Sequence, residues 1–170
     1  MINNERFLIF LSKLAEVYPI GRVKYAPGTL ASLVALVFGY YILTICKINF
    51  FLLFVFIFVI FSYLLCDAHI RVYNKKDPNE VVVDEFAGQF IAILGIIDST
   101  NISYILTSLL FSFVLFRFFD ITKIGPIKKF EKLPGGIGII ADDLVAGLFA
   151  FLTQVAILTS IGHPLIIKTL

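Results

Sequence analysis

The sequence has few of the residues from which sulfur or nitrogen metal centres are built. Its 170 residues include two cysteines, two histidines and no tryptophan. Cys46 and Cys66 lie near opposite ends of one hydrophobic run, and a helix would hold them about 30 Å apart, too far for a disulfide. Two lone thiols make no zinc site, and His69 and His163 are isolated from each other. The sequence therefore gives no support for a disulfide framework or a zinc centre.

Charged residues are also scarce. They make up 15% of the chain, with a net charge of +2, and no basic block of the kind that binds nucleic acids is present. Residues 1–24 carry charges of both signs, and no cleavage pattern follows them, so they do not form a cleavable signal. The apolar residues Phe7, Phe10, Leu11 and Leu14 recur at helical spacing. They predict a short amphipathic helix, lying on a membrane surface or packed against the rest of the protein.

Apolar residues, in contrast, are abundant. They form 59% of the sequence, including 19 phenylalanines, and the mean hydropathy is +0.98. Soluble domains are roughly 45–50% apolar, and a fold of this size could not bury the excess. We therefore predict an integral membrane protein with a single domain over residues 1–170.

The apolar residues gather in long runs whose lengths suit membrane helices, which need about 20 residues to cross a bilayer. The five segments are 29–46, 49–66, 81–97, 103–119 and 138–162. They predict an all-α fold, a polytopic membrane helical bundle with about five membrane-embedded helices plus the N-terminal amphipathic helix. The third segment is short, and whether it fully spans the membrane is left open.

Lysine and arginine are distributed unevenly between the two sides of this arrangement. With five crossings, the N-terminal segment and loops 67–80 and 120–137 share one side, which is rich in both residues. The other side has only Lys47 and Lys168. The positive-inside rule makes the rich side cytoplasmic, so we predict a multi-pass membrane protein with its N-terminus in the cytoplasm and its C-terminus outside. If the third segment only re-enters the membrane, this separation is lost for the later loops.

Acidic residues follow the same partition. The predicted helix ends on the cytoplasmic side carry carboxylates, and only Asp98 falls on the outer side. Ionisable groups inside membrane segments are costly and by default suggest function. A single pair could be explained by the helix dipole alone, but two pairs at matching depth favour a site. The carboxylates at these helix ends are Asp67, Asp84, Glu85, Asp120, Asp142 and Asp143. All of them except Asp67 are candidate site residues.

Oxygen-rich clusters of this kind suit Mg²⁺, which takes one or two carboxylates together with phosphate and water. Asp120 supports this interpretation, because a carboxylate at a helix C-terminus opposes the dipole and needs a nearby cation. Gly88 and Gly147 each follow a site carboxylate by four residues, and small residues let membrane helices approach closely. We expect segments 81–97 and 138–162 to meet along these glycines.

Two turn motifs precede predicted helices on the same side. Residues 26–29 (APGT) and 134–138 (PGGIG) lead into helix N-termini, where free N–H groups attract anions. Gly28 and Thr29 are therefore candidate phosphate contacts. The basic side chains of Arg22, Arg117 and Lys123 on the same side could each contact a phosphate as well. Each motif alone has a plainer explanation as a helix cap or a loop.

Four stretches together resemble the phosphatidylglycerophosphatase A family. They are residues 26–30 (APGTL), 77–89 (DPNEVVVDEFAGQ), 116–123 (FRFFDITK) and 135–147 (GGIGIIADDLVAG), in the family's order. The chain departs from the family pattern at Ile124-Gly125-Pro126, because the family often has a second proline directly after the lysine.

The resemblance implies a Mg²⁺-dependent phosphatase of the bacterial inner (plasma) membrane, with its active site facing the cytoplasm. It would convert phosphatidylglycerophosphate in the membrane to phosphatidylglycerol. The implied acidic residues are Asp84, Glu85, Asp120, Asp142 and Asp143, with Asp84, Asp120 and Asp143 as catalytic candidates. The metal would activate water, or Asp84 or Asp143 would attack phosphorus. The number of metal ions, the acyl-chain preference and the oligomeric state stay open.

Two other functions are compatible with intramembrane carboxylates. A small ion-coupled transporter would place them near the bilayer midplane or at broken helices. A phospholipid headgroup transferase would also need acidic residues and magnesium. The position of the carboxylates along the helices separates the first alternative from a phosphatase, and an assay separates the second.

Overall fold

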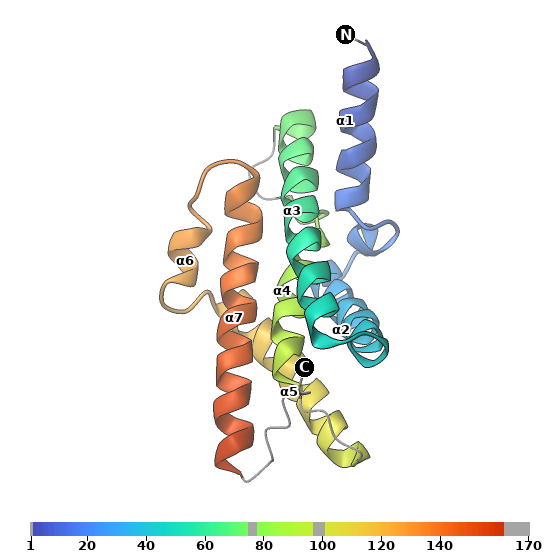
Figure 1. The fold of residues 1–170 in the computed structure, drawn as a ribbon. Helices are drawn as coiled ribbons and strands as arrows, with labels where there is room; N and C mark the ends of the chain where they lie inside the picture. Colours follow the sequence, from blue (N-terminus) through green and yellow to red (C-terminus); the bar gives the residue numbers. More distant parts are fainter. Residues whose placement is uncertain (1, 75–77, 97–100, 162–170) are drawn as a thin grey trace.

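The computed structural model describes residues 2–74, 78–96 and 101–161, and these ranges contain helices but no strand. The helices are α1 (Ile2–Ala15), η1 (Ile20–Arg22), α2 (Pro27–Ile45), α3 (Ile48–Tyr73), α4 (Val83–Ala92), η2 (Ile93–Gly95), α5 (Ile102–Thr122), α6 (Ile127–Phe130) and α7 (Gly136–Ser160) (Figure 1). The predicted all-α bundle is confirmed. Asp77, Asp98, His163 and Lys168, which the sequence analysis named, lie outside the described residues.

Four helices are long and apolar enough to cross a membrane: α2, α3, α5 and α7. Most of α3 and α5 is not covered by the rest of the chain, and their large apolar side chains point outward. Such faces are stable in lipid but not in water. The protein is therefore a membrane protein whose outer surface is apolar along these helices.

The third predicted segment, 81–97, contains a shorter helix than expected. α4 has 10 residues and continues into the three residues of η2. At about 1.5 Å per residue, α4 is about 15 Å long, roughly half of the ~30 Å hydrocarbon core. It packs against α2, α3 and α7, and most of its residues are buried. α4 is thus an embedded fifth helix, enclosed by the helices that are long enough to span.

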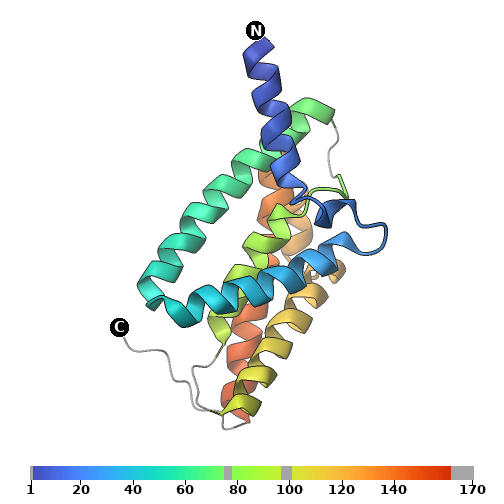
Figure 2. The ribbon, with the colours of Figure 1, turned by 90° about the vertical axis from the view of Figure 1, so that its right-hand side faces the viewer.

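Successive helices run in opposite directions, so the helix ends that carry the site residues gather at one end of the bundle. We call it the site end: it carries the first turns of α2, α4 and α7 and the last turn of α5. Figure 2 shows α5 rising toward the first turn of α2, and Gly28 of α2 lies close to both Glu85 of α4 and Arg117 of α5. This alternation is the one expected for five membrane-embedded segments, because the chain reverses between α4 and α5.

The far end of α4 is secured by a buried side chain of α7. Nε2 of Gln154 donates to the carbonyl oxygens of Gly95 and Ser108, at 3.0 Å each. Gln154 itself is completely buried. Helix ends leave carbonyl groups unpaired, and in a membrane these groups have no water to accept from. Gln154 therefore lets a short helix end inside the bundle.

Replacing Gln154 with leucine is expected to lower the free energy of unfolding by about 1–3 kcal/mol, because the buried Gly95 carbonyl loses its side-chain donor and the Ser108 carbonyl, inside α5, loses an additional one. Thermal unfolding of the purified full chain in detergent measures the change. Thr159→Val is the matched control, since the Thr159 hydroxyl bonds only within its own helix and is exposed. A melting temperature equal to that of the unmodified chain would contradict this role for Gln154.

The predicted N-terminal helix is present as α1, and it packs against the bundle. Its Ser12 hydroxyl lies 3.0 Å from Nδ1 of His69 on α3, and the Val82 amide donates to the Ala15 carbonyl at 3.1 Å. In both views α1 extends past the other helices at the site end (Figures 1 and 2). Of the two predicted placements, packing is the one observed, and it ties α1 to the segment that leads into α4.

Candidate active site

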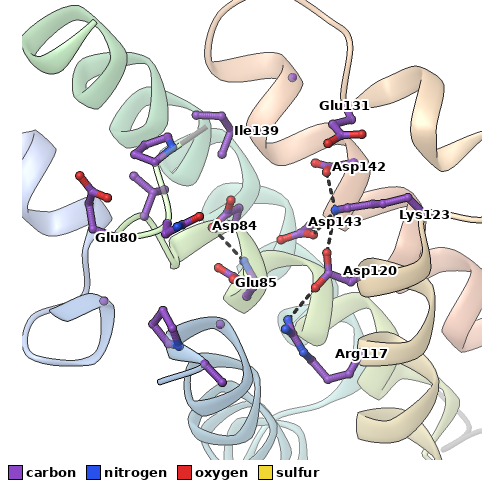
Figure 3. A pocket seen from close by; sticks show the side chains of 18 of the residues that line it. Glu80, Asp84, Glu85, Arg117, Asp120, Lys123, Glu131, Ile139, Asp142 and Asp143 are labelled. Atoms are coloured by element: carbon purple, nitrogen blue, oxygen red, sulfur yellow. Dashed lines mark hydrogen bonds and ion pairs between the residues drawn. The ribbon is translucent and has the colours of Figure 1, made fainter. Parts of the chain in front are cut away.

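A pocket of about 860 Å³ opens at the site end of the bundle (Figure 3). Its wall is built from the first turns of α2, α4 and α7, the last turn of α5 and the loops beside them. The charged residues that line it are Lys24, Glu80, Asp84, Glu85, Arg117, Asp120, Lys123, Glu131, Lys132, Asp142 and Asp143. All five carboxylates that the sequence predicted for the site therefore lie in one cavity, although they come from three helices.

Three of these carboxylates form a tight group. Asp84, Glu85 and Asp143 each offer an oxygen atom, and the three atoms lie within 4.8 Å of one another. Asp84 is 8% exposed and Asp143 is 3% exposed, and Oε2 of Glu85 is buried without a hydrogen-bond partner among the described residues. Buried like charges repel strongly unless protons or a cation neutralise them. The group therefore has a geometry that could hold a cation.

The remaining two carboxylates, Asp120 and Asp142, are paired with basic side chains. Nη1 of Arg117 donates to Oδ2 of Asp120 at 2.6 Å. Nζ of Lys123 donates to Oδ1 of Asp120 at 2.7 Å and to Oδ2 of Asp142 at 2.5 Å. These ion pairs meet the need, inferred from the sequence, for a cation beside Asp120 at the end of α5.

Lys123 lies at the centre of this second group. It caps α5 in the left-handed conformation, with φ of 48°, and its amide donates to the Phe119 carbonyl. Burial by itself would lower the pKa of its ammonium group. The charges of Asp143 and Asp120 outweigh that effect, so the pKa of Lys123 is raised above its ordinary value. Lys123 thus carries a full positive charge within the pocket.

Glycines allow the helices that carry the carboxylates to approach one another. A Cβ atom on Gly147 would collide with the carbonyl of Gly88, and one on Gly88 would lie 2.6 Å from the carbonyl oxygen of Asp143. The expected meeting of the two segments along these glycines is confirmed. A Cβ on Gly28 would likewise collide with Oε1 of Glu85. Backbone contact at Gly88 and Gly147 places Asp84 and Glu85 beside Asp143.

Not all of the candidate phosphate contacts line the pocket. Gly28, Arg117 and Lys123 line the pocket, whereas Thr29 lies in the first turn of α2 without lining it. The helix begins at Pro27, with Ala26 as its cap, so Thr29 is one residue further along the helix than Gly28 and does not cap it. Gly135 and Gly138 at the start of α7 also line the pocket, and the N-termini of α2, α4 and α7 all border it.

Sequence reasoning missed some residues that line the pocket or lie beside it. Ser32 donates to the Gly28 carbonyl at 2.7 Å and receives a longer bond, of 3.4 Å, from Nη1 of Arg117. Glu80 and Lys132 line the pocket wall. The only sequence signal for Glu80 and Lys132 was that both fall in loops on the predicted cytoplasmic side, where the site lies. Asp67, in contrast, pairs with Arg71 on α3 and does not line the pocket.

Comparisons with known proteins converge on one family. A family model described as phosphatidylglycerophosphatase A matches residues 13–158. The chain is 37% identical to the phosphatidylglycerophosphatase A of Haemophilus influenzae over 85% of this chain and 86% of that protein. It is 30% identical to the phosphatidylglycerophosphatase A of Escherichia coli over 88% of this chain and 82% of that protein.

A third relative matches over a shorter stretch. It is a putative phosphatidylinositol-3-phosphatase of Bacteroides thetaiotaomicron, 38% identical over 45% of this chain and 46% of that protein. No solved structure matches the chain. The family is therefore established by sequence, and the geometry of the pocket comes from the present structure.

Proposed function

Because this chain belongs to the phosphatidylglycerophosphatase A family, we propose that its pocket hydrolyses the terminal phosphate of phosphatidylglycerophosphate, giving phosphatidylglycerol and inorganic phosphate. The observation that carries this proposal is the convergence of five carboxylates and two basic side chains in one cavity at the end of apolar helices. A lipid can keep its acyl chains in the bilayer while only its headgroup enters such a cavity.

The group formed by Asp84, Glu85 and Asp143 fits a magnesium ion. All its donors are carboxylate oxygens, which Mg²⁺ prefers, and the buried Oε2 of Glu85 lacks a partner among the described residues. When bound, the ion would supply Lewis-acid stabilisation of phosphoryl oxygens and lower the pKa of a bound water. The chemistry of the donor set therefore supports Mg²⁺ as the cofactor.

The other residues of the pocket bind and orient the phosphate. Arg117 and Lys123 bring positive charge to the side opposite Asp84, and Asp120 holds both of them in place through ion pairs. The first turn of α2, at Gly28, adds the favourable end of a helix dipole. These groups stabilise the negative charge that spreads over the phosphoryl oxygens in the transition state. The nucleophile is water or the carboxylate of Asp84 or Asp143.

The distribution of lysine supports a cytoplasmic pocket. Lys24, Lys128, Lys129 and Lys132 are exposed near the site end, and positively charged loops stay on the cytoplasmic side of a bacterial inner membrane. The carboxylates lie at helix ends, and the buried polar residues farther along the helices, Gln89 and Gln154, carry no charge. This arrangement favours a phosphatase over an ion-coupled transporter.

The test is phosphate release by the purified full chain from phosphatidylglycerophosphate in mixed micelles. We expect release with Mg²⁺, background release with a chelator, and recovery when Mg²⁺ is restored. Phosphatidic acid and phosphatidylinositol 3-phosphate serve as comparison substrates and should be poorer. No release from phosphatidylglycerophosphate at any Mg²⁺ concentration would contradict the proposed activity, and undiminished release with the chelator would contradict the metal requirement.

A further inference from the structure

The five carboxylates that the sequence predicted for the site fall into two sets with different partners. Asp84, Glu85 and Asp143 are grouped around a common point. Asp120 is engaged on both oxygens, with Oδ1 accepting from Lys123 and Oδ2 from Arg117. Figure 3 shows the Lys123 side chain reaching between Asp120 and Asp142, with Asp143 beside it. The first set could take up a metal cation, whereas the carboxylates of the second set are already paired with the positively charged side chains of Arg117 and Lys123.

The ammonium group of Lys123 lies where a two-metal site would need its second ion. Paired metal ions in phosphate-transferring enzymes lie about 3.5–4 Å apart and share bridging carboxylates. Asp143 belongs to the first set but also lies beside the second, because its Oδ1 is 3.6 Å from Nζ of Lys123. A second ion bridged by Asp143 and held by Asp120 or Asp142 would have to displace this ammonium group.

Lys123 is also firmly held in that position. Its backbone closes α5 through a hydrogen bond to Phe119, and its side chain forms two short ion pairs to two different helices. Only Oδ1 of Asp142 stays buried without a partner in this second set, among the described residues. A single uncommitted oxygen is a poor site for Mg²⁺, which requires octahedral coordination.

We propose that Lys123 replaces a second metal ion: the pocket binds one divalent cation, at Asp84, Glu85 and Asp143, and the Lys123 ammonium is the second positive centre, between Asp120 and Asp142. This inference rests on the metal site of the proposed function. It gives Lys123 a role in setting the metal stoichiometry in addition to contacting phosphate. It also separates Asp142, a partner of lysine, from Asp143, a ligand of the metal.

The experiment counts Mn²⁺ ions bound per chain, with Mn²⁺ alone as the probe. Electron paramagnetic resonance of free Mn²⁺ during titration of the purified full chain gives the stoichiometry. We expect one ion in the unmodified chain and two in Lys123→Gln, whose bound ions should show dipolar coupling. Lys123→Arg keeps the charge and should bind one. Lys128→Gln, which changes an exposed lysine of α6 outside the pocket, is the matched control and should also bind one.

Each possible number of bound ions either supports or contradicts the inference. Two ions in the unmodified chain, or one ion in folded Lys123→Gln, would overturn the inference and leave the proposed phosphatase activity standing. No bound ion in the unmodified chain would instead remove the metal from the proposed function. If Lys123→Gln does not fold, Asp142→Asn takes its place: it should bind one ion within about threefold of the normal affinity, whereas a loss of 10-fold or more, the size expected for a group supporting a metal, would overturn the inference.

Discussion

Replacing Asp143 with asparagine is expected to lower the rate of phosphate release at least about 100-fold. The loss of groups that merely orient metal ligands typically costs 10–100-fold, so the loss of a proposed ligand should reach at least the top of that range. Asp143 is 3% exposed, is grouped with Asp84 and Glu85, and has its Oδ1 3.6 Å from Nζ of Lys123. The substitution keeps the shape of the side chain and removes its charge, so the chemistry should change more than the packing. Initial rates of phosphate release at saturating Mg²⁺ measure the effect.

Asp67→Asn is the matched control for this substitution. Asp67 is a carboxylate near the same end of the bundle, but it pairs with Arg71 and does not line the pocket. We expect it to keep its activity within about twofold, in line with the small contribution of a surface ion pair. Normal activity in a folded Asp143→Asn protein would rule out the proposed site.

A methyl group added at Gly147 is expected to reduce both stability and activity. Its Cβ would collide with the Gly88 carbonyl, and Cα of Gly88 would lie only 3.1 Å away. Both obstacles are backbone, so α4 and α7 must separate, and overpacking of this kind costs about 1–3 kcal/mol. The separation moves Asp84 away from Asp143, and a misplacement of about 1 Å can lower a rate about 100-fold. Thermal unfolding and phosphate release of Gly147→Ala measure the two effects.

The predicted loss of stability in Gly147→Ala is opposite in sign to the effect of helix propensity. Alanine is favoured over glycine inside helices by about 1 kcal/mol, so without the collision the variant would be more stable than the parent. Leu148→Phe adds a larger group to the next residue of α7, whose side chain is 45% exposed on the outer face. This control should leave both measurements nearly unchanged. A stable and active Gly147→Ala protein would show that the close approach of the helices is not needed.

Much of the fold followed from the sequence because apolar runs have few alternatives to membrane helices. The runs at 29–46, 49–66, 103–119 and 138–162 correspond to α2, α3, α5 and α7. The spacing of four between Asp84 and Gly88, and between Asp143 and Gly147, placed each carboxylate on the same face as a glycine. Helical periodicity is local, so a sequence contains enough information to predict which residues share a face.

The length of α4 was not determined in this way. Hydropathy predicted one segment over 81–97, yet α4 ends at Ala92 and η2 begins at Ile93. A helix can end inside an apolar bundle only if its carbonyl groups find donors. Here a donor comes from Gln154, 59 residues beyond Gly95 in the sequence. A partner so distant along the chain leaves no local pattern by which the end of the helix could be predicted.

The gathering of acidic residues at the helix ends, and through the family motifs the class of reaction, were readable from the sequence alone. Only the tertiary structure divided those residues into a close group at Asp84, Glu85 and Asp143, whose oxygens could hold a cation, and a lysine-paired group at Asp120 and Asp142. It also left Thr29 outside the pocket and brought Ser32 beside Arg117. The physical reason is that ion pairing and coordination depend on distances of a few ångströms between helices. Those distances are set by where backbones can touch, at Gly88 and Gly147, and by which side chain reaches across.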